Sequence, residues 1–277
     1  MKSDGGDIKR RKRKHHTGAL VVLCAVLAGV TVLALWITET TKEYQEEENQ
    51  ARQEQIQAVP IEENGASDEN RRREYTEEQK ERSREIYYAN RETLILVNKN
   101  HKISGEYDPK LRKICKGRLM ASSRLYQDLC ELLEASPYSY WIASAYRTEE
   151  RQQELIDEDI KKYQKQGMDW EAARERTLKT VMPAGYSEHQ TGLALDILCS
   201  ENTKMDISQA NEKGNQWLAE HAHLYGFILR YPVDKEDITG ILYEPWHFRY
   251  VGREAAKFLY ENDMTLEEFY ECLDVET

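Results

Sequence analysis

The sequence lacks the two residue spacings by which zinc proteins are most readily recognised. Its five cysteines include no CxxC pair, and its seven histidines include no HExxH segment. The second absence excludes the metal-binding helix of the better-known zinc peptidases. We predict no zinc role for Cys115, Cys130, Cys199 or Cys272, which are scattered along the chain, and we expect small buried thiols rather than disulfides there.

Beyond the first sixteen residues, positive charges are outnumbered by negative ones. The chain has a net charge of −11, whereas residues 1–16 hold seven Lys or Arg and two Asp and are therefore at +5. The remainder is at −16, and this balance excludes nucleic acid as a partner. We interpret the acidity as a solvated surface without a specific partner.

An uncharged run of twenty residues, Gly18–Ile37, follows the basic segment. At about 1.5 Å per residue, a helix of this length crosses a hydrocarbon layer of roughly 30 Å. The Lys and Arg residues before it place the N-terminus in the cytoplasm. We therefore expect a cytoplasmic basic arm over 1–16, a single transmembrane anchor over 17–37, and the rest outside the cell. A cleaved signal peptide is the alternative, although the run exceeds the usual core of about 7 to 15 residues.

Apolar residues are few between positions 38 and 84, where Glu, Gln, Asn, Arg and Lys dominate. This composition predicts a polar linker or helical stalk. Residues 85–277 are expected to form the folded domain, of the α+β class, with a small antiparallel sheet flanked by helices. The expected strands are 93–99, 140–147, 192–198, 227–231 and 241–251, and the expected helices are 119–133, 149–180, 215–227 with a stop at Gly226, and 253–274.

The segment SEHQTGLALD places His189 seven positions before Asp196, with Gly192 between them. We expect His189 in a loop and Asp196 on the following strand, so that one short loop offers two metal ligands. A carboxylate between Leu195 and Ile197 needs a cation or several hydrogen-bond donors to offset its desolvation. A buried aspartate that caps a turn or pairs with an arginine fits these residues equally well.

A second segment, EPWH, places Glu244 and His247 three residues apart. In an unbroken strand these side chains would point to opposite faces. Pro245 cannot donate to a sheet ladder, and it predicts a bend or bulge that brings both toward one centre. Two imidazoles and one carboxylate can hold zinc with a fourth position left open. Taken alone, His247 also fits a packed core histidine.

Together the two segments match a family signature. SEHQTGLALD and EPWHFRY, accompanied by LVNK, SAYRTEERQ and YGFILRYP, resemble the zinc D-alanyl-D-alanine carboxypeptidases of the VanY type, which include related L,D-carboxypeptidases. The resemblance covers roughly Leu94 to Val251. It implies a sheet that carries a Zn2+ site, with His189, Asp196 and His247 as metal ligands.

The same resemblance implies that Glu244 is the catalytic carboxylate. It would take a proton from water and later pass it to the leaving amine. An ion pair with Arg249 or Arg253 is the alternative for this residue.

Arg147, in SAYRT, is implied to bind the substrate or the transition state, because a guanidinium can grip a carboxylate or stabilise an oxyanion. Gln152 and Ser187 are its expected polar, substrate-binding neighbours. A simple ion pair of Arg147 with Glu149 or Glu150 is the alternative.

Topology and resemblance together predict a single-pass membrane protein of a Gram-positive bacterium. Its zinc carboxypeptidase domain would remove the C-terminal D-alanine of peptidoglycan stem peptides outside the cell. An L,D-carboxypeptidase acting on tetrapeptide stems is the alternative, because the motifs do not separate the two. An endopeptidase would need an open groove. A non-catalytic wall-binding module would have lost Glu244 or a ligand, and the sequence retains all of them.

Overall fold

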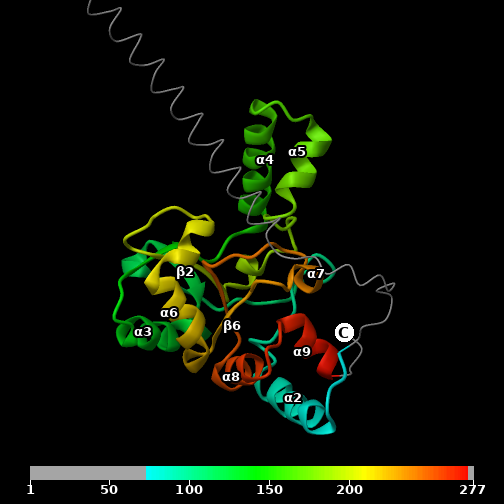
Figure 1. The fold of residues 1–277 in the computed structure, drawn as a ribbon, viewed down its shortest axis with the longest axis vertical. Coiled ribbons are helices and arrows are strands. Elements are labelled where there is room, and N and C mark those ends of the chain that lie inside the picture. Colours follow the sequence, from blue (N-terminus) through cyan, green and yellow to red (C-terminus); the bar gives the residue numbers. More distant parts are fainter. Residues whose placement is uncertain (1–72, 274–277) are drawn as a thin grey trace, which may run out of the picture. The chain divides into compact units, whose positions relative to one another are not determined.

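The computed structural model describes residues 73–273, and an antiparallel sheet of four strands lies at their centre (Figure 1). Its strand order is β3 (Tyr140–Ser144), β4 (Ala194–Cys199), β6 (His247–Tyr250) and β5 (Phe227–Leu229). A separate antiparallel pair is formed by β1 (Leu111–Ile114) and β2 (Leu119–Ser122). Helices surround both sheets, so the predicted α+β class is confirmed.

Strand β4 is buried along its whole length. It lies between β3 and β6, which use the backbone hydrogen-bonding groups on its two edges. Leu195 and Ile197 belong to the main core together with Leu129 of α3 (Tyr126–Ala135) and Leu218 of α6 (Lys213–His221). Because side chains alternate along a strand, Asp196 points to the face opposite Leu195 and Ile197. The strand thus separates a carboxylate from the apolar core.

A second apolar cluster holds three helices together: α2 (Glu77–Asn90), α8 (Arg253–Glu261) and α9 (Leu266–Leu273). Figure 1 shows α2 beside α9, although the two are at opposite ends of the described chain. Thr76 and Gln79 form a capping box at the start of α2, and Ile86 is buried in the cluster. The compact unit begins at Arg73, so the boundary expected between residues 84 and 85 falls inside a packed helix.

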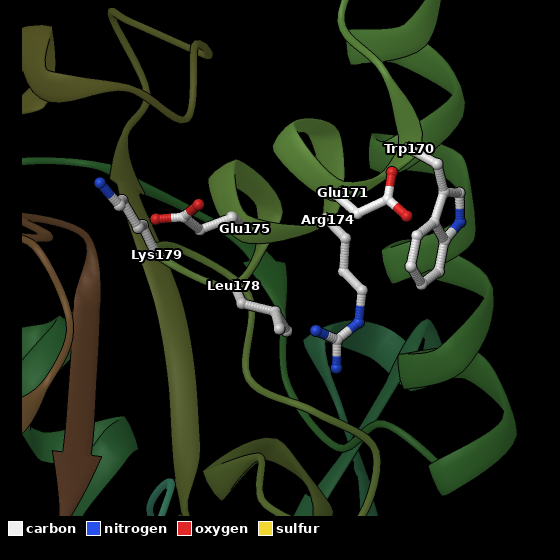
Figure 2. A pocket seen from close by; sticks show the side chains of 6 residues that line it. All are labelled: Trp170, Glu171, Arg174, Glu175, Leu178 and Lys179. Carbon is white, nitrogen blue, oxygen red and sulfur yellow. The ribbon is translucent and has the colours of Figure 1, made fainter.

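Helices α4 (Glu149–Lys165) and α5 (Trp170–Thr177) form a hairpin that projects from the sheet (Figure 1). Gly167, with φ of +97°, lies in the turn, and Asp169 caps α5. The hairpin borders a hollow of about 490 Å³ (Figure 2), lined by Trp170, Glu171, Arg174, Glu175, Leu178 and Lys179. None of these residues was predicted from the sequence to belong to the metal site.

Short helical segments complete the described part: η1 (Cys115–Gly117), η2 (Ser123–Leu125), η3 (Glu188–Thr191), η4 (Ile207–Asn211), η5 (Ala222–Tyr225) and α7 (Glu236–Thr239). Gly226, with φ of +83°, ends η5, as its predicted role as a helix stop requires. The four cysteines in this part of the chain are free. Cys199 and Cys272 are buried, as expected, whereas Cys115 is half-buried and Cys130 is exposed.

Several expected elements differ from the structure. The helix expected over 149–180 is divided into α4 and α5, and the strand expected over 241–251 begins only at His247. The segment 93–99 contains only an isolated bridge from Asn98 to His101, and the carbonyls of Thr93 and Ile95 accept hydrogen bonds from the side chain of Arg249. A side-chain donor thus takes the place of a neighbouring strand. The helix expected over 119–133 begins only at Tyr126, because residues 119–122 pair with β1 as a strand.

The predicted cytoplasmic arm and membrane anchor, and most of the predicted linker, lie outside the described residues. Within residues 73–273, no helix combines the length and apolar character needed to cross a bilayer.

Candidate metal centre and catalytic site

Three adjacent strands each bring one site residue to the same face of the sheet. In the antiparallel register, Asp196 of β4 lies opposite His247 of β6 and is paired with Ser144 of β3. Directly opposite residues project to the same face of a sheet. The register therefore places a carboxylate and an imidazole side by side from segments far apart in the sequence.

His189 reaches this place from η3, which precedes β4. Gly192 ends η3 with φ of +69°, and a Cβ at this position would lie 3.0 Å from the backbone N of Ser122. The turn directs the chain into β4. Nδ1 of His189 lies 2.6 Å from the carbonyl oxygen of Ala145. Because a carbonyl only accepts hydrogen bonds, Nδ1 carries the proton and Nε2 remains as the ligand atom.

The three predicted ligands form a buried cluster whose candidate ligand atoms all lie within 4.8 Å of one another. Nε2 of His189 is 3.3 Å from Oδ2 of Asp196, and Nδ1 of His247 is 3.3 Å from Oδ1. Oδ1 of Asp196 is buried without a hydrogen-bond partner among the described residues. A divalent cation would satisfy this oxygen, and two imidazoles with one carboxylate are a donor set that suits zinc with a position left open.

The ionisable groups of the cluster shift one another's pKa values. Burial alone would raise the pKa of Asp196, but His189 and His247 outweigh it and hold this pKa well below its usual range. Burial and the nearby Arg147 lower the pKa of His189. For His247, burial acts in the same direction, but the carboxylates of Asp196 and Glu188 prevail and raise its pKa to about 9. Asp196 is therefore ionised at neutral pH, as a metal ligand must be.

Glu244 lies beside the ligands because it precedes β6 and belongs to a turn rather than to the strand. The backbone N of His247 donates to the carbonyl of Glu244 across a turn that contains Pro245, and β6 begins only at His247. The predicted bend is therefore present, and it brings Oε2 of Glu244 to 3.7 Å from Nδ1 of His247. Burial raises the pKa of Glu244 to about 8, against the opposing effects of His247 and Arg147. Such a carboxyl group is suited to both accepting and donating a proton.

The alternative ion pairs of Glu244 are not formed in the described part of the chain. Arg249 binds Glu188 with an Nη1 to Oε1 distance of 2.7 Å. Arg253 binds Asp128 and Glu131 on the surface. Both arginines are therefore engaged elsewhere, and Glu244 is left to the metal cluster.

Arg147 lies next to the ligands and is mostly buried. Its backbone N donates to the carbonyl of His189. Its guanidinium donates twice to Ser144 Oγ, once to Gln152 Oε1 at 2.8 Å, and once to Asp196 Oδ2 at 3.3 Å. A guanidinium has five N–H groups, so one on Nη1 remains for a further acceptor. Burial lowers the pKa of Arg147, and the carboxylates of Asp196 and Glu244 oppose this effect.

The other two predicted substrate-binding residues, Gln152 and Ser187, are both buried near Arg147 and the ligands, but of the two only Gln152 forms a hydrogen bond with Arg147. Gln152 is 1% exposed, and its amide joins Arg147 to the carbonyl of Met182. The structure thus makes Gln152 a support for Arg147. Ser187 is buried just before η3, and its hydroxyl forms no hydrogen bond within residues 73–273. The side chain of Glu149, an alternative partner of Arg147, lies near Lys102 instead.

One group near the site was not predicted from the sequence. Glu188, inside the segment SEHQTGLALD, is fully buried and binds both Arg230 and Arg249. These two guanidinium groups hold the pKa of Glu188 well below its usual range, although burial opposes this. The sequence does contain a sign of such a partner. Arg230 and Arg249 each lie in an apolar segment, FILRYP and HFRYV, and a buried arginine requires an anionic partner.

A buried set of two histidines and an aspartate, with a glutamate and an arginine beside it, defines a metal-dependent hydrolase domain of α+β fold. Comparison with known proteins gives the family. Residues 120–253 match the family described as VanY, D-alanyl-D-alanine carboxypeptidase. Over 179 residues the chain is 41% identical to a D-alanyl-D-alanine carboxypeptidase of Enterococcus faecalis, a match that covers 64% of this chain and 65% of that protein.

Two solved structures are similar to this chain in both sequence and fold. The crystal structure of a mutant of the vancomycin resistance D,D-pentapeptidase VanY, in complex with Zn(II), is 37% identical with a TM-score of 0.58, and the match covers 65% of this chain and 99% of that chain. The LdcB LD-carboxypeptidase is 34% identical with a TM-score of 0.56, over 66% of this chain and 88% of that one. The chain belongs to the VanY family, and the resemblance seen in its motifs is confirmed.

Proposed function

We propose that the domain is a zinc D-alanyl-D-alanine carboxypeptidase that hydrolyses the C-terminal D-alanine of peptidoglycan stem peptides. The observation that carries the proposal is the buried cluster of His189, Asp196 and His247, with Glu244 at 3.7 Å from its edge. Related structures add support, because one VanY structure is a complex with Zn(II) and another, VanYB, is a complex with D-alanine-D-alanine.

Each residue has a distinct task in this reaction. His189, Asp196 and His247 would hold zinc, which when bound polarises the scissile carbonyl and lowers the pKa of water. Glu244 accepts the proton of the attacking water and returns it to the leaving amine. Arg147, through its remaining N–H, stabilises negative charge on the substrate or in the transition state.

An L,D-carboxypeptidase remains the second candidate because the ligands and Glu244 do not distinguish the two reactions. The similarity to the LdcB LD-carboxypeptidase favours keeping it. The two activities differ in the configuration of the residue that precedes the terminal D-alanine. That residue would be read by the pocket around it rather than by the metal ligands.

Mass spectrometry of pentapeptide and tetrapeptide muropeptides after incubation with the protein tests both candidates. Loss of one alanine from the pentapeptide alone is the expected result, and removal of zinc by a chelator should abolish it, with recovery on adding zinc. Loss of alanine only from the tetrapeptide would replace the proposal with the L,D activity. No change in either muropeptide would favour a binding module.

We further propose that one N-terminal helix over residues 17–37 anchors the protein, with the catalytic domain outside the cell. The uncharged run and the preceding basic segment support this topology, as does the external location of peptidoglycan. The protein should stay in the membrane fraction after alkaline carbonate washing, and protease added to protoplasts should digest the domain. Release by carbonate, or protection from the protease, would contradict the topology.

A further inference from the structure

Glu188 is a buried carboxylate between the metal ligands and two arginines. Its side chain is 0% exposed, as are those of Arg230 and Arg249. One oxygen, Oε1, accepts from Nε of Arg230 and from Nη1 of Arg249, each at 2.7 Å. Two charged donors on a single oxygen fix the orientation of the carboxylate plane.

Both arginines are themselves held from other directions. Nη1 and Nη2 of Arg230 bind the two carboxylate oxygens of Glu267, at 2.8 and 2.6 Å. Arg249 donates from Nε to the backbone carbonyl of Tyr250, and from Nη2 to those of Thr93 and Ile95. Two positive and two negative side chains thus form a balanced buried network, and Glu188 has little freedom to rotate.

The second oxygen of Glu188 points to a metal ligand. Oε2 lies 3.5 Å from Nε2 of His247, and neither atom has a hydrogen-bond partner elsewhere among the described residues. The other ring nitrogen, Nδ1, faces Asp196 at 3.3 Å. Both ring nitrogens therefore face a carboxylate. With a cation between Nδ1 and Asp196, Nδ1 must offer its lone pair, and the proton of the neutral ring belongs on Nε2, where Oε2 of Glu188 attracts it.

We propose that Glu188 is a positioning residue that selects the Nε2–H tautomer of His247 and so turns the lone pair of Nδ1 toward the metal cluster. The inference rests on the proposed function, because it assumes that the cluster holds zinc. Carboxylate partners of this kind orient metal-binding histidines and strengthen metal affinity by about 10- to 100-fold. The arginines act indirectly, by keeping Oε1 occupied and Oε2 directed at the ring.

Glu188→Gln tests the proposal because the amide has only one acceptor oxygen. That oxygen must remain with Arg230 and Arg249, which are both donors, so the NH2 group faces Nε2 of His247. Nε2 then becomes the acceptor and Nδ1 carries the proton, which blocks its lone pair. We expect the zinc affinity of the full chain in detergent, measured by competition with a chelator, to fall about 10- to 100-fold.

Glu268→Gln is the matched control. Glu268 is also a buried carboxylate with two cationic partners, Arg73 and Lys235, but it lies on α9 away from His247. The Glu268→Gln variant should therefore bind zinc as tightly as the unmodified protein. Equal zinc affinity in Glu188→Gln and the unmodified protein, or an equal loss in both variants, would overturn the proposal.

A direct readout does not require the variant to fold. In the zinc-loaded, unmodified chain with 15N-labelled histidine, NMR should show a proton on Nε2 of His247 and metal on Nδ1. Metal on Nε2 would overturn the inference. Absence of zinc from the unmodified protein would overturn the proposed function as well. Normal zinc content without hydrolysis of stem peptides would overturn only the proposed function, so the two failures can be distinguished.

Discussion

Replacement of Glu244 by Gln is expected to leave zinc bound while lowering kcat about 100- to 10,000-fold, the usual contribution of a general base. Glutamine keeps the size and polarity of the side chain but cannot accept a proton at neutral pH. The three candidate ligand atoms belong to other residues, so the metal should remain. Release of D-alanine under steady-state conditions and the zinc content of the purified protein measure the two parts of this expectation.

Glu236→Gln provides a control of the same chemistry, since Glu236 is exposed on the short helix α7. Its activity should equal that of the unmodified protein. Hydrolysis by Glu244→Gln at the unmodified rate would show that another group moves the proton. Loss of zinc from the same variant would instead make Glu244 part of the metal coordination.

The site residues were predictable because they lie in two short segments with restrictive features. A carboxylate in the apolar strand of Leu195 and Ile197 needs a cation, and the proline after Glu244 interrupts a strand where a bend is required. The structure contains both features, with Asp196 opposite His247 and a turn at Pro245. Local chemistry therefore marked these residues as candidates, and the family resemblance was needed to assign the ligands and the role of the neighbouring glutamate.

The supporting contacts could not be predicted in the same way because they join distant parts of the chain. Glu188 meets Arg249 across 61 positions, and the carbonyl of Thr93 meets Arg249 across 156. The compact apolar run in the segment 93–99 indicates a strand, but only the folded chain shows that an arginine satisfies its carbonyls. Tertiary contacts here overrule a local pattern.

The start of the domain shows the same limitation. The segment before residue 85 is polar, and its composition predicts a linker. In the folded chain, Gln79 of α2 donates to Asn262 across 183 positions, and Arg73 donates to the carbonyl of Asn262. Polar residues at the surface of this helix hide the small buried face that includes Ile86. A helix with so few buried apolar residues cannot be recognised from its hydrophobic pattern alone.

Arg147→Ala should lower kcat/KM for stem peptides about 100- to 1,000-fold, the range seen when a charge-stabilising donor is removed. Arg151→Ala is the matched control, because Arg151 is exposed on α4 and pairs only with Glu154 and Glu158 among the described residues. Zinc content must be measured in parallel, since Arg147 also contacts Asp196. A kcat/KM close to the unmodified value would exclude Arg147 from the reaction.

The remaining donor of Arg147 has two possible partners, which amidated substrates separate. Four of its N–H groups are used by Ser144, Gln152 and Asp196. The one that is left cannot make the two parallel bonds of a guanidinium–carboxylate fork unless an existing bond breaks. If it binds the terminal carboxylate, the unmodified protein should strongly prefer free peptides, and Arg147→Ala should lose that preference. Equal turnover of free and amidated peptides by the unmodified protein would rule out the anchor and leave stabilisation of the oxyanion as the role of Arg147.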